Sequence, residues 1–151
     1  RPGAWSRDDE YSFDEAAAAA AAIQRAGGLV GVGAHGELQG LGYHWEMWAL
    51  AMGGMTPREV LQAATIDGAR IIGIDADLGS IEERKLADLV VLDANPLEDI
   101  HNTNTILYVM KNGELYDGDT LDQIWPTERP LPRFWWWDAQ VGERGGTDGE
   151  S

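Results

Sequence analysis

Residues 78–93, which read LGSIEERKLADLVVLD, restrict the fold of this chain more than any other stretch. A Gly-Ser turn opens the stretch, a charged connector follows, and an apolar run of β-formers between two aspartates closes it. A short apolar run bounded by turn signals predicts a buried strand, and the charges of the connector suit an exposed hairpin. The stretch therefore predicts strands at 79–82 and 88–93 with a polar connection between them.

Helix and hairpin signals flank this stretch in a fixed order. Upstream, residues 56–59 form a Thr-Pro-Arg-Glu capping box with proline at the first helical position, which predicts the start of a helix. Residues 65–72 continue as a further helical piece. Downstream, residues 105–111 and 114–117 are predicted strands joined by Asn-Gly, a dipeptide typical of two-residue hairpins.

The order of these motifs resembles one protein family. It reads "TP-E-L-AT--GA--IG", then "LGSI-----ADLVVLD-NPL-DI", then "V--NG", within residues 27–117. This resembles the C-terminal end of the metal-dependent amidohydrolase superfamily, which contains imidazolonepropionase, prolidase-like and dihydroorotase-like enzymes. The resemblance implies an α/β fold: the C-terminal part of a (β/α)8 amidohydrolase barrel plus the returning strands of its small β-sandwich domain. The barrel carries the metals in that superfamily, so no chemistry is expected at Asp88, Asp93 or Lys85.

The resemblance and the composition together predict four regions. Residues 1–77 are expected to form the last helix-strand-helix units of the barrel, and residues 78–117 the β-sandwich strands. Residues 118–141 are expected to form a Pro/Trp-rich strap that begins with a short helix at 119–124. Its Phe-Trp-Trp-Trp run is expected to pack on the body or on a partner chain, with a platform that stacks on a ligand as the alternative. Residues 142–151 read as a disordered tail.

The N-terminal part predicts two helices around one strand. A capping box at 12–15 opens a helix through the alanine-rich residues 16–26, and a second helix spans 43–52; a pair of glycines ends each. Residues 29–34 read as a strand buried between layers, because they are apolar on both faces. One barrel strand of eight cannot close a barrel. The chain therefore completes a barrel supplied by another chain or, as we favour, is the C-terminal piece of a longer protein, in keeping with its start at Arg1.

Composition excludes several classes of partner. The 26 acidic and 11 basic side chains give a formal charge of −15, which repels phosphate backbones and anionic membrane surfaces, so nucleic acid is not an expected partner. No run approaches the roughly 20 apolar residues of a membrane helix, and the first residues lack the apolar core of a signal peptide. The chain has no cysteine, which excludes disulfides and thiolate metal sites and leaves the compartment open.

A glycine-rich segment precedes the second helix. Residues 31–36 match G-x-G-x-x-G, but a dinucleotide fingerprint needs a full strand before the first glycine and a helix at the third, and here the glycines lie inside the predicted strand. We interpret the match as coincidental. His35 is the better candidate, because it falls at the C-terminal end of a buried parallel strand, where the active-site groups of barrels project.

The resemblance gives His35 a specific role. In the superfamily the last barrel strand ends in an aspartate that binds metal and acts as general base, and alignment through the glycines places His35 at that position. An imidazole can bind zinc or accept a proton, but it brings no negative charge. His35 is therefore the expected catalytic residue and a candidate metal ligand, with a structural histidine as the alternative.

Other polar residues near His35 are weaker candidates. His44, at the start of the second predicted helix, could face the same mouth as a metal ligand, or it could pack against tryptophan. Glu37 and Glu46 could add carboxylates, or they could be a loop acid and a solvated residue on a helix face. His101 lies in a polar run and is expected at the surface.

The remaining metal ligands of the superfamily are missing. Its His-x-His pair, central lysine or glutamate, and two later histidines have no counterpart here. The resemblance therefore implies a divalent metal, preferably zinc, in the intact protein, while this chain can hold none by itself. The expected function is the C-terminal segment of a metal-dependent hydrolase acting on C–N bonds of cyclic amides, amides or peptides, inactive alone. Its partners would be the rest of the barrel, a small-molecule or peptide substrate, and a second copy in a homo-oligomer. The competing interpretation is a non-catalytic acidic interaction module.

Overall fold

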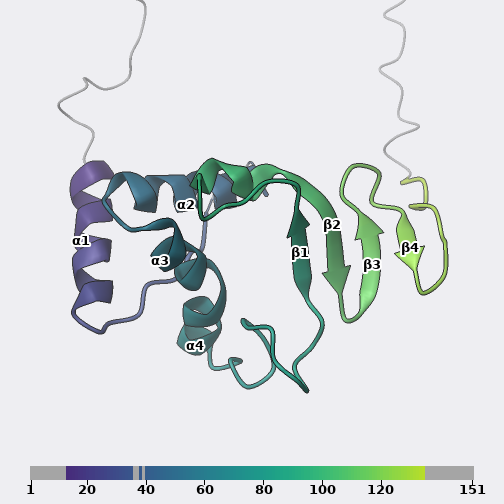
Figure 1. Cartoon of the computed structure of the whole chain (residues 1–151), viewed down its shortest axis with the longest axis horizontal. Coiled ribbons are helices and arrows are strands. Elements are labelled where there is room, and N and C mark those ends of the chain that lie inside the picture. The colour runs from purple at the N-terminus through teal and green to yellow at the C-terminus, as the bar shows by residue number, and fades with distance from the viewer. Residues whose placement is uncertain (1–12, 36–37, 39, 135–151) are drawn as a thin grey trace, which may run out of the picture.

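The computed structural model describes residues 13–35, 38 and 40–134. In these ranges the α-helices come first along the chain, and the strands follow with one 3-10 helix between the first two of them (Figure 1). The helical segments are α1 (Phe13–Arg25), α2 (Leu41–Met52), α3 (Pro57–Gln62), the π-helical η2 (Ala63–Asp67), α4 (Gly68–Ile72) and the 3-10 helix η3 (Ile100–Asn104). The strands are β1 (Leu89–Leu92), β2 (Ile106–Lys111), β3 (Glu114–Asp117) and β4 (Gln123–Trp125). None of the helices in these ranges is long and apolar enough to cross a membrane.

Glycine pairs end α1 and α2, as predicted. Gly27 has φ 88° and donates to the Gln24 carbonyl at 2.9 Å, while Gly28 donates to the Ile23 carbonyl at 2.9 Å. This pair of bonds closes a helix through a left-handed residue, which glycine adopts without a steric penalty. Gly54 ends α2 in the same manner with φ 94°.

The predicted capping box of α3 is present in full. The Thr56 hydroxyl accepts from the Glu59 amide at 3.3 Å, and the Glu59 carboxylate accepts from the Thr56 amide at 2.7 Å. The helical piece predicted at 65–72 is also confirmed, and it continues from α3 through η2 into α4. Ser12, the predicted cap of α1, lies outside the described residues, and α2 begins two residues before the predicted start, at Leu41.

The hydrophobic core lies among the helices rather than against the sheet. Its buried members come from α1, α2, α3, η2, η3 and the link before α3, namely Ala21, Met47, Leu50, Met55, Val60, Ala63 and Ile100. Burial of such side chains is the main favourable term in folding. The helical half therefore has a centre of its own, onto which Val30 and Val32 pack from the segment that precedes α2.

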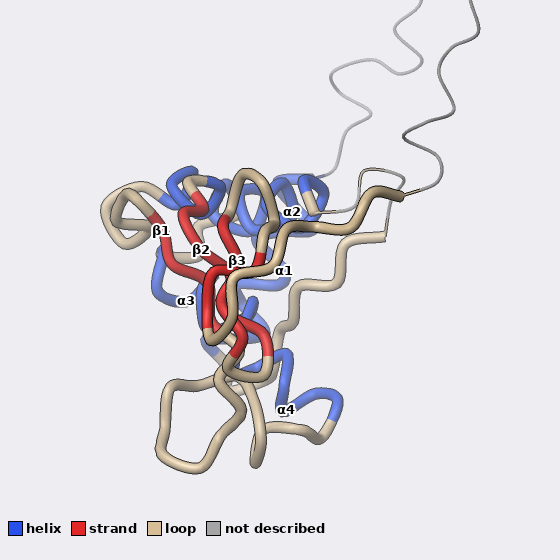
Figure 2. The backbone as a smooth tube through the Cα atoms, turned by 90° about the vertical axis from the view of Figure 1, so that its right-hand side faces the viewer, coloured by secondary structure: helices blue, strands red, loops and turns tan. Residues whose placement is uncertain are grey.

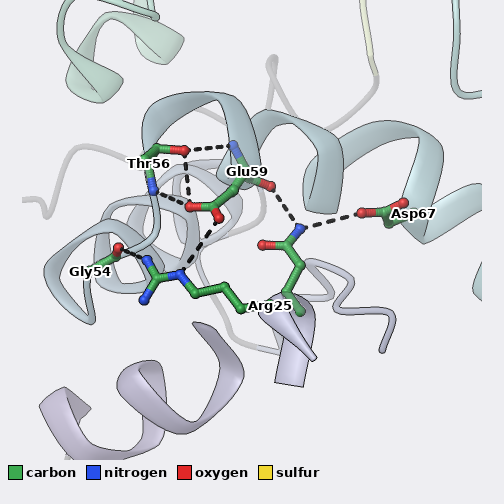
Figure 3. Close-up of polar contacts among 6 residues, drawn as sticks. Arg25, Gly54, Thr56, Glu59 and Asp67 are labelled. Atoms are coloured by element: carbon green, nitrogen blue, oxygen red, sulfur yellow. Dashed lines mark hydrogen bonds and ion pairs between the residues drawn. The ribbon is translucent and has the colours of Figure 1, made fainter. Parts of the chain in front are cut away.

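Polar side chains join α1 to the start of α3 at one edge of this core (Figure 3). Arg25 donates to the Gly54 carbonyl at 2.5 Å and lies 3.7 Å from the Glu59 carboxylate. Gln24 donates to the Glu59 carbonyl at 3.3 Å and to the buried Asp67 carboxylate at 3.4 Å. These contacts satisfy groups at the ends of three helical segments, and we assign them a structural role.

The sheet is antiparallel, with strand order β1-β2-β3-β4. The β2–β3 turn has positive φ at both Asn112 (51°) and Gly113 (81°), which confirms the predicted two-residue hairpin. Viewed from the β4 side, the strands lie in front of the helices (Figure 2). The strand register places Val90, Val109 and Tyr116 on one face and Leu89, Met110 and Leu115 on the other.

Both faces of the sheet are thus apolar, yet of its residues only Gln123 is buried within the described part of the chain. An antiparallel sheet with one solvated face shows alternation of apolar and polar residues. The runs LVVL and ILYVM show none. Both faces therefore carry apolar side chains that are at most half-buried within the described residues.

Residues 79–82, predicted as a strand, form a bend and an irregular segment instead. Gly79 has φ 91°, and a Cβ on it would lie 2.7 Å from the Ala69 Cβ, so its backbone packs directly on α4. Ile81 is 86% exposed. The segment packs on a helix and pairs with no described strand, so the prediction was wrong.

Two further predictions of secondary structure were wrong. Residues 29–34 form no strand in the described residues, because a parallel strand needs a neighbouring strand; the Val32 amide donates instead to the Ala63 carbonyl at 3.3 Å. The short helix predicted at 119–124 is a turn followed by β4. The Asp117 carboxylate accepts from the amides of Asp119 (3.0 Å) and Thr120 (2.9 Å), which stabilises that turn.

The described part of the predicted strap continues the sheet. The amide and carbonyl of Arg129 pair with those of Gln123, both at 2.9 Å, so the chain runs back along the outer edge of β4. The three tryptophans that follow Phe134, and the predicted tail at 142–151, lie outside the described residues.

Candidate functional site

Within residues 78–93, Lys85 makes several structural contacts. Its ammonium group donates to the Asp75 carbonyl and to the Ser80 hydroxyl, each at 2.6 Å, and lies 3.3 Å from the Glu82 carboxylate. The side chain is only 11% exposed. Lys85 therefore holds the loop between α4 and β1 together and is occupied by structural contacts.

Asp88 performs a similar task at the β2–β3 hairpin. Its carboxylate accepts from the Asn112 amide at 2.7 Å and pairs with the Lys111 ammonium. The Asn112 hydrogen bond and then Lys111 hold the pKa of Asp88 below its ordinary value. Asp88 thus caps the turn, and the Gly113 amide adds a bond to the Ala87 carbonyl at 3.0 Å.

His35 lies at the end of the segment that leads from α1 to α2. It is exposed, and residues 36–37 directly after it are outside the described ranges. The backbone before it is held at two successive amides: Val32 donates to the Ala63 carbonyl at 3.3 Å, and Gly33 donates to the Glu46 carboxylate at 3.2 Å. The catalytic and metal-binding role of His35 stays a prediction.

His44 lies on α2, is half-buried and contacts η3. Its Nδ1 lies 3.1 Å from the Thr103 hydroxyl, and its ring centroid lies 6.4 Å from that of Trp48. Burial lowers the pKa of His44, because a desolvated imidazole resists protonation. These contacts match the structural alternative for His44, and its metal-binding role also stays a prediction.

Glu46 makes a contact that the sequence analysis did not predict. It is half-buried and accepts a hydrogen bond from the Gly33 amide. The pKa of Tyr43 is raised, first by the burial of its own hydroxyl and then by the negative charge of Glu46. Nothing in the local sequence shows that a carboxylate on α2 reaches the backbone 13 residues earlier. Glu37 is outside the described residues. His101 is exposed, as predicted, with its ring 4.8 Å from that of Trp48.

The donors of the described residues do not make up a metal centre. No group of three or more His, Asp or Glu side chains in those ranges is arranged to hold an ion. A catalytic zinc site needs three protein ligands and an open position. A metal implied by the resemblance would therefore need ligands from elsewhere, with His35 at most one of them.

An open groove of about 580 Å³ separates the helices from β1. Its lining is mainly apolar and includes Val32, Leu61, Ile72, Leu86 and Val90. Its one carboxylate, Asp88, is already bound to the hairpin. The groove is suited to packing against apolar protein, and it offers no constellation for acid–base chemistry.

Residues 6–116 match the description of the amidohydrolase family. This chain belongs to the amidohydrolase family. Its helical layer and antiparallel sheet resemble part of solved amidohydrolase structures. A structure from Bifidobacterium longum, provisionally assigned as a prolidase, is 36% identical with a TM-score of 0.58, covering 80% of this chain and 28% of the other. A prolidase complexed with N-methylphosphonate-L-proline is 32% identical with a TM-score of 0.53, covering 67% and 26%.

Relatives of known name that are similar to this chain include enzymes with different names. Ochratoxinase of Aspergillus niger is 39% identical over 75 residues, which is 47% of this chain and 16% of the relative. Imidazolonepropionase of Shouchella clausii is 47% identical over 64 residues, which is 40% of this chain and 14% of the relative. The amidohydrolase chain thus matches only a small part of the length of each relative.

Proposed function

We propose that this amidohydrolase chain is the C-terminal portion of a metal-dependent hydrolase that cleaves C–N bonds. In this proposal residues 29–34, which form no strand in the described chain, lie where the last unit of a (β/α)8 barrel would be completed by the rest of the protein. The helix α2 follows that unit, and β1–β4 are half of a small sandwich. The family match over residues 6–116 supports the lineage. The small share of each relative that is matched supports a larger whole.

The observation that carries the proposal is the position of His35. It follows a segment packed on the helical core and precedes α2. In the proposed barrel this position would correspond to the C-terminal end of the last strand, where active-site groups project. Its imidazole is exposed, so a substrate or an ion can approach it. We assign His35 the task of holding or accepting a proton at the reacting centre, while the upstream part of the protein supplies the ligands of a divalent metal, preferably zinc.

We propose only the type of bond that is cleaved, a C–N bond, and a broad class of substrates. The relatives carry names as different as ochratoxinase, S-triazine hydrolase and molinate hydrolase. The formal charge of −15 disfavours polyanionic substrates, because the negative protein surface would repel them within about one Debye length. Cyclic amides, amides and small peptides remain the proposed class.

The test is His35→Ala in the full-length protein that contains this chain. Loss of a proton-transfer group lowers kcat by about 10² to 10⁴-fold, and the thermal midpoint should stay near that of the parent because His35 is exposed. Turnover of an amide and dipeptide panel measures the first, and a melting curve the second. His101→Ala, which removes another exposed imidazole, is the control and should keep kcat. Unchanged turnover in His35→Ala would refute the role of this residue.

A further inference from the structure

The carboxylate of Glu46 binds the backbone that leads to His35. Its Oε2 accepts from the Gly33 amide at 3.2 Å, and Gly33 is two residues before His35. Glu46 lies on α2, which follows His35 in the chain. The hydrogen bond therefore ties the helix after the candidate residue to the segment before it.

The neighbouring amide is held from another element. Val32 donates to the Ala63 carbonyl in η2 at 3.3 Å and packs on the helical core. A planar peptide unit has no free rotation of its own, so one hydrogen bond on each of two successive amides restricts the direction in which the chain continues. Val32 and Gly33 together set the direction of the backbone into His35.

Packing does not replace the bond at Gly33. A Cβ on Gly31 would lie 3.0 Å from the Ile71 Cδ1, so that glycine is held by close packing on α4. A Cβ on Gly33 would meet no described atom within 4 Å. Glycine loses more conformational freedom than any other residue when it is ordered, so Gly33 is the weak point of the segment. The Glu46 hydrogen bond supplies the restraint that packing leaves out.

We propose that Glu46 is the positioning residue for His35, acting through the Gly33 amide. The inference rests on the proposed function, because it presumes that His35 acts at the reacting centre. Glu46 has no contact with substrate in this scheme. It keeps the imidazole in the place where attack is productive, and displacement of a reacting group by about 1 Å can cost about 10²-fold in rate.

Three substitutions of Glu46 in the full-length protein distinguish the effect of its hydrogen-bond acceptor oxygen from the effect of its negative charge. Glu46→Gln keeps an acceptor oxygen at the same reach and loses the charge, Glu46→Leu loses both, and Glu46→Asp keeps the charge on a shorter side chain. The first readout is hydrogen exchange of the peptide that spans 29–36, followed by mass spectrometry. The second is kcat and KM on the substrate that the intact protein turns over.

We expect the leucine and aspartate variants to exchange faster at 29–36 and to lose about tenfold or more in kcat with KM little changed, because the ground-state contacts of the substrate remain. The glutamine variant should resemble the parent in both. A melting curve shows whether the leucine variant is folded. If that variant is unfolded, the aspartate variant tests the loss of the Gly33 hydrogen bond in its place.

Tyr43→Phe is the matched control. The Tyr43 hydroxyl, on the same helix as Glu46, donates to the Ala64 carbonyl at 2.8 Å, so its removal also costs one bond between a side chain and a backbone. It leaves the Gly33 bond intact, and both exchange at 29–36 and kcat should stay at the parental values.

Two outcomes overturn the inference and leave the proposed function standing: parental exchange in the leucine and aspartate variants, or faster exchange with unchanged kcat, in a protein whose His35→Ala variant is inactive. A parent with no hydrolase activity, or an active His35→Ala variant, overturns the proposed function and the inference with it. Faster exchange, lower kcat and rescue by glutamine, all in a protein that needs His35, support both.

Discussion

Gly79 lies where the loop after α4 touches the helical layer. Its φ of 91° is in the left-handed region, and a Cβ there would lie 2.7 Å from the Ala69 Cβ and 3.0 Å from the Ile66 Cα. Two features therefore require glycine at position 79: its left-handed φ, and the lack of room for a Cβ beside Ala69 and Ile66. Lys85 then closes the same loop through the Ser80 hydroxyl.

Gly79→Ala should therefore destabilise the protein by more than a positive φ alone explains. A left-handed conformation costs an alanine about 1–2 kcal/mol, and the contact with Ala69 should raise the total to about 3 kcal/mol or more. Gly54→Ala is the control, because Gly54 has φ 94° and open space around it. Urea unfolding of the full-length protein gives the two midpoints. Equal losses of stability would show that the loop moves away at no cost.

Single residues also show where sequence reasoning succeeded and where it could not. The capping box of Thr56 and Glu59 is a contact between residues three apart, so it could be predicted from spacing. The bond from Gly33 to Glu46 depends on the way α2 folds back over the preceding segment, which no local pattern encodes. The site role of His35 stays a prediction, and the contact of Glu46 with the backbone before it was not foreseen.

At the scale of elements, η3 joins the helical half to the sheet through α2. The Trp48 indole donates to the Ile100 carbonyl and to the Thr103 hydroxyl, both at 3.2 Å. His44 lies 3.1 Å from the same hydroxyl. Because β2 follows η3 almost directly, these contacts determine how the sheet is attached to the helices.

This attachment should weaken in mild acid. Burial lowers the pKa of His44 below its ordinary value of 6.5, so the unfolded chain binds the proton more tightly than the folded one. The contribution of His44 is present above about pH 6.5 and is lost as the pH falls toward its folded pKa.

His44→Gln should remove that dependence, because glutamine does not titrate and its amide can still bond to Thr103. Thermal midpoints measured between pH 7.5 and 5 should fall less in the variant than in the parent. Parallel curves for the two proteins would show that protonation of His44 is not linked to folding.

At the scale of the whole molecule, the described chain has a helical core but a sheet whose apolar side chains are at most half-buried on either face. The groove of about 580 Å³ beside β1 adds further apolar surface. Exposed apolar area of this kind is typical of surfaces that bind other protein or ligands, and in our proposal the rest of the amidohydrolase covers it. The surfaces fit a chain that belongs to a larger amidohydrolase.

The isolated 151-residue chain should therefore bind no stoichiometric metal and hydrolyse no substrate. The described residues offer no cluster of three metal-binding side chains, and a single imidazole binds zinc weakly. Metal analysis after dialysis and assays on the amide panel measure this directly. Tight zinc binding with turnover by the isolated chain would refute the division of labour between this chain and the rest of the protein.

Most features that the amino-acid order alone predicted correctly are made by near neighbours in the chain: the glycine ends of α1 and α2, the capping box of α3 and the Asn-Gly hairpin. The strands β1, β2 and β3 were also predicted, from their runs of β-forming residues. The family resemblance depended on the same local motifs. Strands at 29–34 and 79–82 were predicted from equally clear patterns and are absent from the described residues, because a strand exists only where another strand supplies its hydrogen bonds. The partners of Gly33, His44 and Gly79 were likewise set by the folded arrangement, since each contact joins segments that are separated in the chain and meet only when the helices pack.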